Sequence, residues 1–561
     1  MAPAEADYIV VGGGLVGCAL ASRLHQGDKS ASILIIEAGK DSTGDPRTID
    51  PKGCFALSGS ELDWAYHTTP QANTKNRIHY NAAGKTLGGG STLNYGGWSR
   101  GDATDYDEWA RVVGDRRWSY ECMLPFFKKS EHHFNPSSDP QQHGFEGPMH
   151  YVSVSASDPE RTYPLREPIR AAWTELGVEY NSDTNSGRLA GLSEIEETWC
   201  DGLRQPAYKA YSLDGVEVLT NTMVHRILFS TKHEGKPVTS AVQLEDGTRI
   251  SARKEVILSA GAQRTPQLLM LSGIGPAMEL YKHTIRPVKH LSHVGQNMFD
   301  HFALFQFWKL LDPSKGLAMG SPLFNKPAYF KGMPNDWAVK EAVPSHLLFS
   351  ALNSDPPLEA DAFGLLRRES ALLPPSRCHI ETMIIYAPAG ANHVGLKLPM
   401  DGTHVASSVM LLLPTSRGHI SLASTSATDT PIINPNYYAT AMDRAALIYG
   451  TRRITKALLE TAAGKEFIAC EVPPPGMPEL TSHSSDDVID ERIRAAGVPH
   501  AHASGTAAMG KVVDPELRVY GIEGLRVADA SVLPVPIGGH PQATLYALAE
   551  QAADMILGSS R

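Results

Sequence analysis

The clearest chemistry in this 561-residue sequence lies in its first 40 residues, where glycines occur with the spacing G-x-G-x-x-G. Gly12 would permit a tight turn, Gly14 would let the backbone approach a pyrophosphate, and Gly17 would let a helix pack closely on a strand. Glu37 follows 20 residues after Gly17 and could accept hydrogen bonds from the two hydroxyls of an adenosine ribose. Its negative charge would disfavour a 2′-phosphate. The motif therefore predicts a dinucleotide ligand, and it does not decide between NAD and FAD.

The elements around this motif are those that a dinucleotide site needs. An apolar run at residues 8–11 predicts a buried parallel strand, residues 15–24 predict a helix, and residues 32–36 predict a second strand. The N-terminus of the helix would offer free N–H groups and the positive end of its dipole to phosphates. A glycine-rich turn without a ligand is the alternative, but strand, turn, helix, strand and acid all occur in the expected order.

The middle of the chain gives fewer signals. Residues 256–258 form a short apolar run that predicts a strand. Thr265 and Pro266 follow, and because threonine is a good N-cap and proline suits the first turn, the pair predicts the start of a short helix. The segments 311–345 and 351–378 contain scattered Pro, Gly and Ser and predict long irregular loops, which could serve as lids or access channels.

The C-terminal part is again clearly patterned. The proline run at 472–476 excludes the interior of a helix or strand. Residues 525–528 predict a strand that leads to Asp529, and Pro541 is expected to begin a helix that ends just before Gly558. The apolar positions of that helix recur with helical spacing at Leu545, Leu548, Ala549, Ala552 and Ile556.

Composition excludes several classes of protein. Hydrophobic residues make up 42% and charged residues 20%, which excludes a disordered chain. The formal net charge of −10 and the absence of a long basic run argue against a nucleic-acid partner. The six cysteines form no C-x-x-C pair, so zinc-ribbon and thioredoxin-type sites are not expected. The cysteines are expected to be reduced thiols. No metal site is predicted.

Localisation is predicted from the same features. The apolar stretch 9–21 begins early, but it lacks a basic flank and contains four glycines, so it is not expected to be a signal peptide. No apolar run approaches the roughly 18 residues that a membrane span needs. We therefore expect an intracellular, cytoplasmic protein with no membrane span.

Several motifs together resemble the glucose–methanol–choline (GMC) family of flavoprotein oxidoreductases, and the resemblance extends over essentially the whole chain. Beyond the first motif, the segments that carry it are 63–71, 84–94, 261–275, 294–301, 502–506 and 539–542. Two long signatures and two histidine segments in the family's order are far more specific than any single motif.

The resemblance implies that the ligand is FAD and that residues 84–94 lie against its isoalloxazine ring and pyrophosphate. Asn94 would lie near the reactive edge of the flavin. Some family members attach the flavin through a histidine just before this asparagine; Leu93 stands there in this sequence and predicts non-covalent FAD. The backbone at Val224 would contact the adenine, and Asp529 the ribityl chain or a phosphate. The full predicted cofactor-binding set is Gly12, Gly14, Leu15, Val16, Gly17, Glu37, Lys85, Gly88, Gly89, Ser91, Asn94, Tyr95, Gly96, Gly97, Val224, Ala260, Gly261, Asp529, Ala530, His540, Pro541 and Gln542.

The resemblance assigns the catalytic roles to two of the 22 histidines. His502 would be the base that takes the hydroxyl proton of an alcohol, and His540 would hold the same oxygen while hydride leaves for flavin N5. His540 directly precedes the helix predicted to begin at Pro541, whose positive end would favour an anionic reduced flavin. Pro541 has no N–H, so Gln542 and later amides would be the donors.

Other histidines and aromatic residues receive weaker assignments. His500 is expected to be a surface or packing residue, with assistance to superoxide formation as the alternative. The pairs His132-His133 and His293/His301 have no metal-ligand context and are expected to be structural. Ala501 is small and would leave room beside the substrate. The aromatic residues proposed to line the pocket, with core packing as the alternative, are Trp98, Phe302, Tyr386 and Tyr437.

These implications define a function and its competitors. The expected reaction is FAD-dependent oxidation of a primary alcohol to an aldehyde, with the flavin reoxidised by O2, giving H2O2, or by another acceptor. The alternative is a non-redox homologue, a lyase or cyclase, that keeps FAD for structural reasons. An NAD-dependent enzyme is disfavoured by the flavin-type signatures. The sequence does not indicate the oligomeric state.

The expected fold class is α/β, with a Rossmann-like FAD-binding domain and a discontinuous substrate-binding domain built on an antiparallel sheet. Residues 1–150, 205–300 and 497–561 are assigned to the FAD-binding domain. Residues 151–204 and 301–496 are assigned to the substrate-binding domain.

Overall fold

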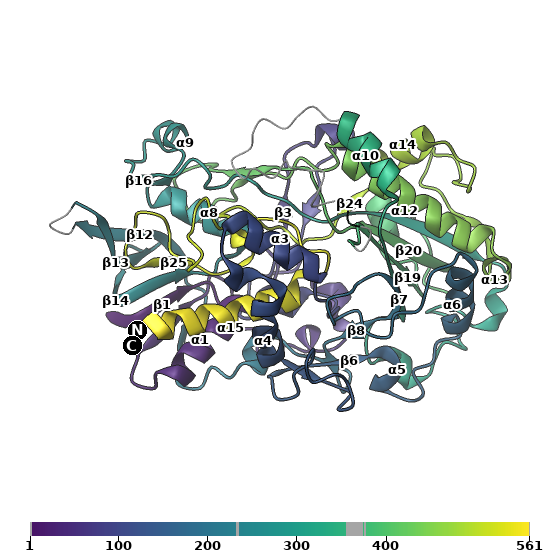
Figure 1. Cartoon of the computed structure of the whole chain (residues 1–561), viewed down its shortest axis with the longest axis horizontal. Helices are drawn as coiled ribbons and strands as arrows, with labels where there is room; N and C mark the ends of the chain where they lie inside the picture. The colour runs from purple at the N-terminus through teal and green to yellow at the C-terminus, as the bar shows by residue number, and fades with distance from the viewer. Residues whose placement is uncertain (1–2, 232–234, 355–373, 375–376, 560–561) are drawn as a thin grey trace.

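Two large sheets lie toward opposite ends of the long axis of the molecule (Figure 1). The computed structural model describes residues 3–231, 235–354, 374 and 377–559. Within these residues each large sheet has seven strands, and the segments between them bring distant parts of the sequence together. The α/β fold class is confirmed.

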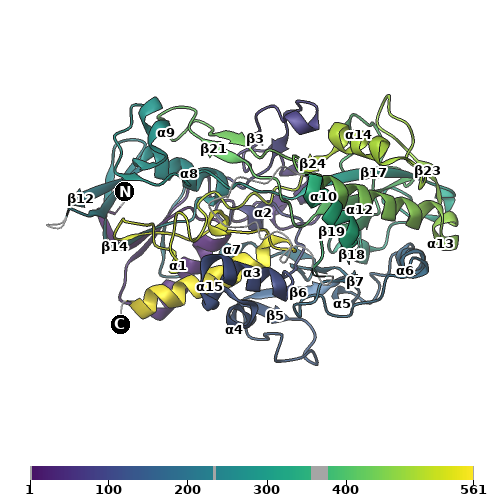
Figure 2. The same cartoon turned by 45° about the horizontal axis from the view of Figure 1, so that its top comes forward.

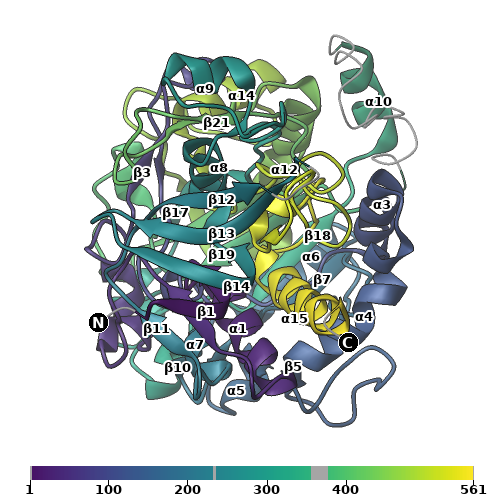
Figure 3. The same ribbon diagram turned by 90° about the vertical axis from the view of Figure 1, so that its left-hand side faces the viewer.

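The first sheet contains the N-terminal glycine motif. Its strands, in spatial order, are β11 (Glu217–Leu219), β2 (Ile33–Ile36), β1 (Glu5–Val11), β14 (Arg249–Leu258), β13 (Pro237–Leu244) and β12 (Val224–Thr231), with β25 (Leu525–Val527) paired to β14. β1 runs parallel to both β2 and β14, as its apolar run predicts, and β25 is parallel to β14. The strands predicted at 8–11, 32–36, 256–258 and 525–528 are therefore confirmed. Figure 3 shows the order from β12 to β1.

Helices α1 (Leu15–Gly27) and α15 (Pro541–Ser559) pack side by side against this sheet (Figure 3). Both begin where the sequence predicts. Gly558 lies inside α15 and not after it. The buried face of α15 includes Leu548, Ala549, Ala552 and Ile556, four of its five predicted apolar positions.

The predicted start of the helix at Thr265 and Pro266 is wrong. Helix α8 spans Gly261–Leu271, so Pro266 lies in its interior. Proline has no N–H to donate to the carbonyl four residues earlier. The structure supplies a substitute, because the Thr506 hydroxyl donates to the Ala262 carbonyl at 2.6 Å. The hydrogen bond from the distant Thr506 thus allows α8 to begin at Gly261, before the start that its own sequence predicts.

The second sheet is antiparallel throughout. In spatial order its strands are β23 (Ile468–Glu471), β17 (Phe302–Leu310), β20 (His404–Leu411), β19 (Ile380–Ile385), β18 (Trp337–Glu341) and β7 (Gly191–Glu194), with β24 (Val498–Pro499) paired to β17. Helix α12 (Ala441–Leu459) packs on one face (Figure 2). The opposite face looks toward the first sheet.

The irregular structure predicted over 311–345 is wrong at β18, which pairs with β19 on one side and β7 on the other. Hydrogen bonding to two neighbours fixes this strand, and local composition does not reveal such partners. Helix α10 (Ser345–Ser354) also occupies the start of the segment predicted as 351–378. Residues 355–373, 375 and 376 of that segment lie outside the described residues. Residues 472–476 are irregular, as predicted.

Shorter elements connect the two sheets. The remaining helices are α2 (Gly90–Leu93), α3 (Ala103–Val113), α4 (Tyr120–Ser130), α5 (Val154–Ser157), α6 (Arg166–Glu175), α7 (Ala207–Ala210), α9 (Ala277–Lys282), α13 (Ala462–Lys465) and α14 (Asp486–Ala496). The remaining strands are β3 (Tyr66–His67), β4 (Tyr80–Asn81), β5 (Glu131–His133), β6 (Met149–Ser153), β8 (Glu196–Glu197), β9 (Trp199–Cys200), β10 (Leu203–Arg204), β15 (Ile274–Gly275), β16 (Lys289–His290), β21 (His419–Ser421) and β22 (Ile432–Asn434).

The division into domains stays a prediction. The strands of the first sheet all come from the segments assigned to the FAD-binding domain. Those of the second sheet come from the other segments, except β24. In the described part of the chain, none of the helices combines the length and apolar character that crossing a membrane requires.

Candidate active site

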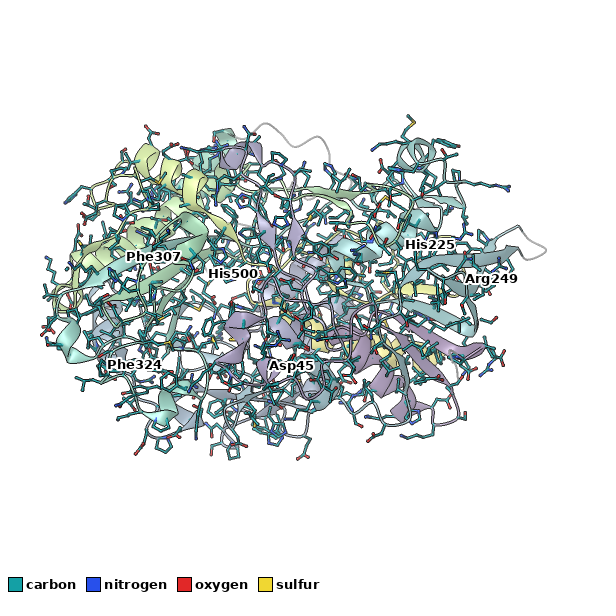
Figure 4. All side chains as sticks on the ribbon, turned by 180° about the vertical axis from the view of Figure 1, so that it is seen from behind. Asp45, His225, Arg249, Phe307, Phe324 and His500 are labelled. Carbon is teal, nitrogen blue, oxygen red and sulfur yellow. The ribbon has the colours of Figure 1, made fainter. Side chains whose placement is uncertain are left out.

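A cavity of about 1250 Å³ lies between the two sheets and is lined by residues from both. Figure 4 shows His500 near the middle of the molecule, between Arg249 and His225 at one end and Phe307 and Phe324 at the other. The predicted site residues that line the cavity are Gly12, Gly14, Leu15, Val16, Glu37, Gly89, Asn94, Tyr95, Gly96, Gly97, Val224, Ala260, Gly261, His502, Asp529, Ala530, His540, Pro541 and Gln542. One continuous space therefore joins the nucleotide motif to both predicted catalytic histidines.

Four predicted cofactor residues, Gly17, Lys85, Gly88 and Ser91, are not among the residues that line the cavity. At Gly17 an added Cβ would overlap the Gly12 carbonyl oxygen, so this glycine allows α1 to pack against β1. Ser91 donates to the Gly88 carbonyl at 2.6 Å and accepts from the Ala207 amide. Lys85 places its ammonium 4.7 Å from the centre of the Trp64 ring. These residues shape the wall, and any contact of theirs with a cofactor stays a prediction.

The turn from β1 to α1 is built for a close ligand. Gly12 has φ +105°, and a Cβ there would overlap the Ser259 carbonyl oxygen. Gly14 is the N-cap of α1 and provides no side-chain cap, so the first amides of the helix remain free for an anion.

Glu37 lies beside this turn, and its carboxylate accepts hydrogen bonds with only part of its capacity. Its two oxygens accept from the Gly13 and Gly39 amides at 2.8 and 2.7 Å. Each oxygen keeps a lone pair, which suits a pair of hydroxyls. Burial raises the pKa of Glu37 to about 7, against the lowering effect of these amides. Hydroxyl donors from a ribose would favour the charged form.

Asp529 lines the cavity with its carboxylate already paired, and its contact with a cofactor stays a prediction. Its carboxylate accepts from the Gly261 amide, the Thr265 hydroxyl, and both the amide and hydroxyl of Ser531. Four donors fill the usual acceptor capacity of a carboxylate. Asp529 therefore ties α8 to the segment after β25, and both of these line the cavity.

Asn94 is held between two partners on the cavity wall. Its amide donates to Gln542 at the start of α15 at 2.7 Å, and its side-chain oxygen accepts from Arg204 at 2.9 Å. Arg204 is fully buried and stacks on Trp199, and none of the described carboxylates forms an ion pair with it. Burial lowers the pKa of Arg204 to about 10. A buried cation thus lies directly behind Asn94.

Three histidines cluster on the other side of the cavity. The ring centres of His502 and His540 are 5.2 Å apart, and those of His500 and His502 are 5.5 Å apart. Ala501 between them has φ +59° and is exposed to the cavity, which fits the prediction that a small residue leaves space there. His500 lines the cavity and stacks on Phe305, which agrees with a packing role, and its assistance to superoxide formation stays a prediction.

His502 is fixed by the residues at the start of β17. Its amide donates to Asp300 at 2.7 Å, and its Nδ1 lies 3.0 Å from Nδ1 of His301. The His301 ring also makes a hydrogen bond with the backbone of Leu412, whose own amide is already used by His379. His301 therefore donates to the Leu412 carbonyl and offers a bare Nδ1 to His502. His502 must then carry its proton on Nδ1, which leaves Nε2 as a bare acceptor.

The electrostatic setting keeps His301, His500 and His502 neutral. Burial, followed by the neighbouring histidines, holds the pKa of His502 well below its ordinary 6.5. Burial likewise lowers the pKa of His301 to about 3 and that of His500 to about 4. A neutral histidine with a bare nitrogen is the form that a general base needs.

His540 has a carboxylate partner that sequence reasoning missed. Its Nε2 lies 2.8 Å from Glu381, and Glu381 also pairs with the buried Lys340 at 3.3 Å. Although burial raises it, the charges of His540 and Lys340 hold the pKa of Glu381 well below its ordinary range. The ionised Glu381 accepts a hydrogen bond from Nε2–H of His540, which fixes the ring and leaves Nδ1 toward Gly97.

Several expectations about other residues are corrected. The four aromatic residues proposed to line the pocket do not: each packs in the protein core. Phe305 lines the cavity in their place and stacks on His500. The structural role predicted for His301 is incomplete, because it contacts His502 directly. A signal for Glu381 exists in the sequence, since it is a single charge in the apolar strand 380–385.

The cavity fits FAD by its shape and chemistry. It contains the free N-terminus of α1, the half-used carboxylate of Glu37, and glycines whose added Cβ would meet no atom within 4 Å, such as Gly90 and Gly261. An extended ligand can therefore approach the backbone at both places. Within the described ranges, no three His, Cys, Asp or Glu side chains gather in a way that could hold a metal ion.

Comparison with protein families gives two matches, both described as GMC oxidoreductase. An N-terminal family model matches residues 6–303, and a C-terminal one matches residues 414–549. The chain is 43% identical over 551 residues to the GMC-type oxidoreductase acuG of Aspergillus aculeatus, covering 98% of this chain and 99% of that protein. It is 34% identical to patulin synthase of Aspergillus clavatus, covering 99% and 92% of the two chains.

Solved structures of two oxidases share this fold over almost their whole length. Formate oxidase of Aspergillus oryzae RIB40 superimposes with a TM-score of 0.87 at 27% identity, covering 100% of this chain and 99% of that one. The superimposed formate oxidase carries a mutation whose effect on FAD modification was studied. Pyridoxine 4-oxidase superimposes with a TM-score of 0.80 at 26% identity, covering 98% and 99%.

Proposed function

Since the chain belongs to the GMC oxidoreductase family of FAD-dependent flavoproteins, we propose that it oxidises a primary alcohol to an aldehyde. The observation that carries this proposal is the pair of histidines in one cavity: His502 presents a bare Nε2 and His540 is locked by Glu381, with 5.2 Å between the ring centres. An alcohol hydroxyl placed between them would meet a base and a second partner at once.

The proposed cofactor is FAD, bound without a covalent bond because Leu93 stands where some family members have the linking histidine. The amides at the start of α1 would hold the pyrophosphate, Glu37 the adenosine ribose, and the segment from Asn94 to Gly97 the flavin ring. When bound, FAD supplies the acceptor for the hydride that leaves the carbinol carbon.

The residues of this chain would carry the proton and position the substrate. His502 takes the hydroxyl proton on Nε2, and its Nδ1 proton stays in the bond to His301. His540 contacts the same oxygen through Nδ1, at an angle fixed by Glu381. Holding the oxygen from two sides aligns the carbinol hydrogen for departure. The proposed electron acceptor is O2 or another oxidant, and the cytoplasmic location stays a proposal.

The test is an anaerobic panel of primary alcohols mixed with the purified yellow holoenzyme. Bleaching of the flavin absorbance by at least one alcohol, followed by recovery in air with formation of peroxide, supports an oxidase. Bleaching that only a dye reverses supports a dehydrogenase. If no alcohol bleaches the flavin while the protein performs a lyase or cyclase conversion, the non-redox alternative holds and the proposal fails.

The pH dependence of the reaction follows from the lowered pKa of His502. The base form persists above its pKa, which burial and its histidine neighbours hold below 6.5. We expect kcat/KM to stay flat from pH 8 down through 6.5 and to fall only at lower pH. Stopped-flow flavin reduction across this range provides the measurement. An acid limb centred above pH 6.5 would contradict a neutral His502.

Glu381→Gln tests the role of the carboxylate behind His540. We expect flavin reduction to slow by about 10²-fold, since His540 loses the partner that orients it. The same change leaves Lys340 buried without a counter-ion, which costs about 3–5 kcal/mol of stability. The double variant Glu381→Gln/Lys340→Met removes both charges. It should recover most of the thermal stability in a melting experiment and none of the rate; recovery of both would mean that Glu381 acts only through stability.

A further inference from the structure

The second sheet presents successive rows of side chains to the cavity, and these rows differ in polarity. The strand register gives the members of the first row on β17, β20 and β19: Ala303, Met410 and Glu381. Glu381 binds His540 at this row, and His301, two residues before Ala303, contacts His502. The contacts that hold both proposed catalytic histidines therefore come from one end of this sheet face.

The next two rows on the same face are almost entirely apolar. Successive side chains of a strand alternate between faces, so Met383 and Ile385 follow Glu381 on the cavity side of β19. The register gives the members of these rows: Phe305, Ser408 and Met383 in the second, and Phe307, Ala406 and Ile385 in the third. At about 3.4 Å per residue, the third row lies about 13 Å from Glu381 along the strand.

Three side chains of these rows present accessible surface to the cavity. Phe305, Met383 and Ile385 are each partly exposed and line it, while the other members of the two rows are buried. Phe305 also stacks on His500, with 6.2 Å between the ring centres, so the apolar surface begins beside the histidine cluster. The surface that a ligand can touch is thus a phenyl ring, a thioether and a branched alkyl group.

The far end of this apolar surface is closed by residues 387–398. Ala391 and Leu396 form a hydrophobic cluster with the buried members of the third row. Met319 lies at the same end, since its amide donates to the Tyr386 carbonyl at 2.8 Å, and its partly exposed side chain also lines the cavity. The cavity therefore contains an elongated apolar chamber that leads away from the histidines.

Charged side chains are missing from the chamber wall. None of the described residues of β17, β19, β20 or 387–400 that line the cavity is Asp, Glu, Lys or Arg. Glu197, which lines the cavity near Met333, is already paired with the buried Arg161. A charged ligand group would lose its water here without gaining a partner, which is unfavourable, whereas an apolar group gains free energy by leaving water.

We propose that the substrate is an uncharged primary alcohol with an elongated apolar body, and that Phe305, Met383 and Ile385 bind this body in the direction away from His502 and His540. The assignment rests on the proposed oxidation of an alcohol. It adds a substrate class to that reaction: a long-chain or extended aryl carbinol, in preference to short or charged alcohols. The flexible thioether of Met383 suits a body of either shape.

The experiment measures kcat/KM for two series of alcohols by anaerobic flavin reduction: 1-butanol to 1-octanol, and benzyl to 4-butylbenzyl alcohol. In at least one series we expect a rise of about 2- to 4-fold per added methylene, because each one is transferred from water to the chamber. 6-Amino-1-hexanol and 6-hydroxyhexanoate resemble 1-heptanol in length and should be at least about 100-fold poorer than it.

Variants of the third row test where the body binds. Ile385→Trp fills this row and should lower the kcat/KM ratio of the longest to the shortest alcohol by about 10-fold or more. Ile385→Ala removes part of the same contact surface and should lower the ratio by about 3-fold, which keeps the test available if the tryptophan variant does not fold. Leu311→Trp adds the same ring at an exposed site just after β17, outside the cavity, and should keep the wild-type ratio.

The outcomes separate this inference from the reaction itself. If kcat/KM rises in neither series, if the charged alcohols match 1-heptanol, or if both Ile385 variants keep the wild-type ratio, the apolar chamber is not the substrate site and the alcohol oxidation stands. If no alcohol bleaches the flavin, the reaction is wrong. Calorimetry of both series with the His502→Ala holoenzyme then tests the chamber alone: affinity that rises with length supports it, and equal affinity overturns it.

Discussion

Replacing His502 by alanine is expected to give a yellow, FAD-containing protein whose flavin is reduced by an alcohol about 10²–10⁴-fold more slowly. In the pair formed by His301 and His502, the other three ring nitrogens take part in hydrogen bonds. Nε2 of His502 is therefore the nitrogen left to accept a proton. Without it, the hydroxyl proton has only His540, whose ring is already held by Glu381. Anaerobic stopped-flow measures the rate, and the flavin-to-protein absorbance ratio verifies that cofactor content is unchanged.

Chemical rescue provides the control for this variant. Alanine leaves space beside His301, and added imidazole should restore part of the rate if the missing nitrogen is the cause. A rate of flavin reduction close to that of the wild type, with full FAD content, would remove His502 from the role of base. Loss of FAD in the variant would instead indicate that its ring supports the cavity.

The second large effect is expected from Gly12→Ala. Its φ of +105° is unfavourable for alanine, and the new Cβ would overlap the Ser259 carbonyl oxygen. Gly12 and Ser259 both line the cavity, so this overlap can be relieved only by moving the β1–α1 turn away from the start of α8. We expect purified protein that has lost most of its FAD and melts well below the wild type.

Gly44→Ala is the matched control. Gly44 also has a positive φ, +89°, but an added Cβ there meets no atom within 4 Å. It therefore carries the backbone penalty alone, roughly 1–2 kcal/mol, and should keep its FAD. Equal flavin content in the two variants would show that the contact with Ser259 does not govern the cofactor site.

The parts of the site that could be predicted from the sequence are those whose residues form a recognisable local pattern. The glycines, Glu37 and the strands and helix around them follow from local pattern, because each performs its task with neighbours in sequence. The prediction of His502 and His540 as catalytic residues rests on the resemblance to a family, since composition does not distinguish 2 histidines among 22. Their positions in one cavity agree with that assignment, while their roles remain to be tested.

The residues that were missed act across long separations. Glu381 reaches His540 over 159 positions, and His301 reaches His502 over 201. The pairing of Glu381 with Lys340 depends on the strand register between β19 and β18, which no local pattern specifies. The helix start at Gly261 was missed for the same reason. The Ala262 carbonyl, which Pro266 cannot pair with, accepts from the distant Thr506 hydroxyl.

The placement of β25 has a consequence for synthesis of the chain. This strand, near the end of the sequence, pairs with β14, and Ser259 bonds to Ala528 across 269 positions. During translation, the edge of β14 that pairs with β25 stays unpaired until nearly the whole polypeptide has left the ribosome. Such non-local pairing slows folding and leaves a transiently exposed edge. Because the residues from Asp529 to Gln542 that line the cavity follow β25, we expect FAD capture to be a late, post-translational event. Nascent chains are expected to depend on chaperones during this interval.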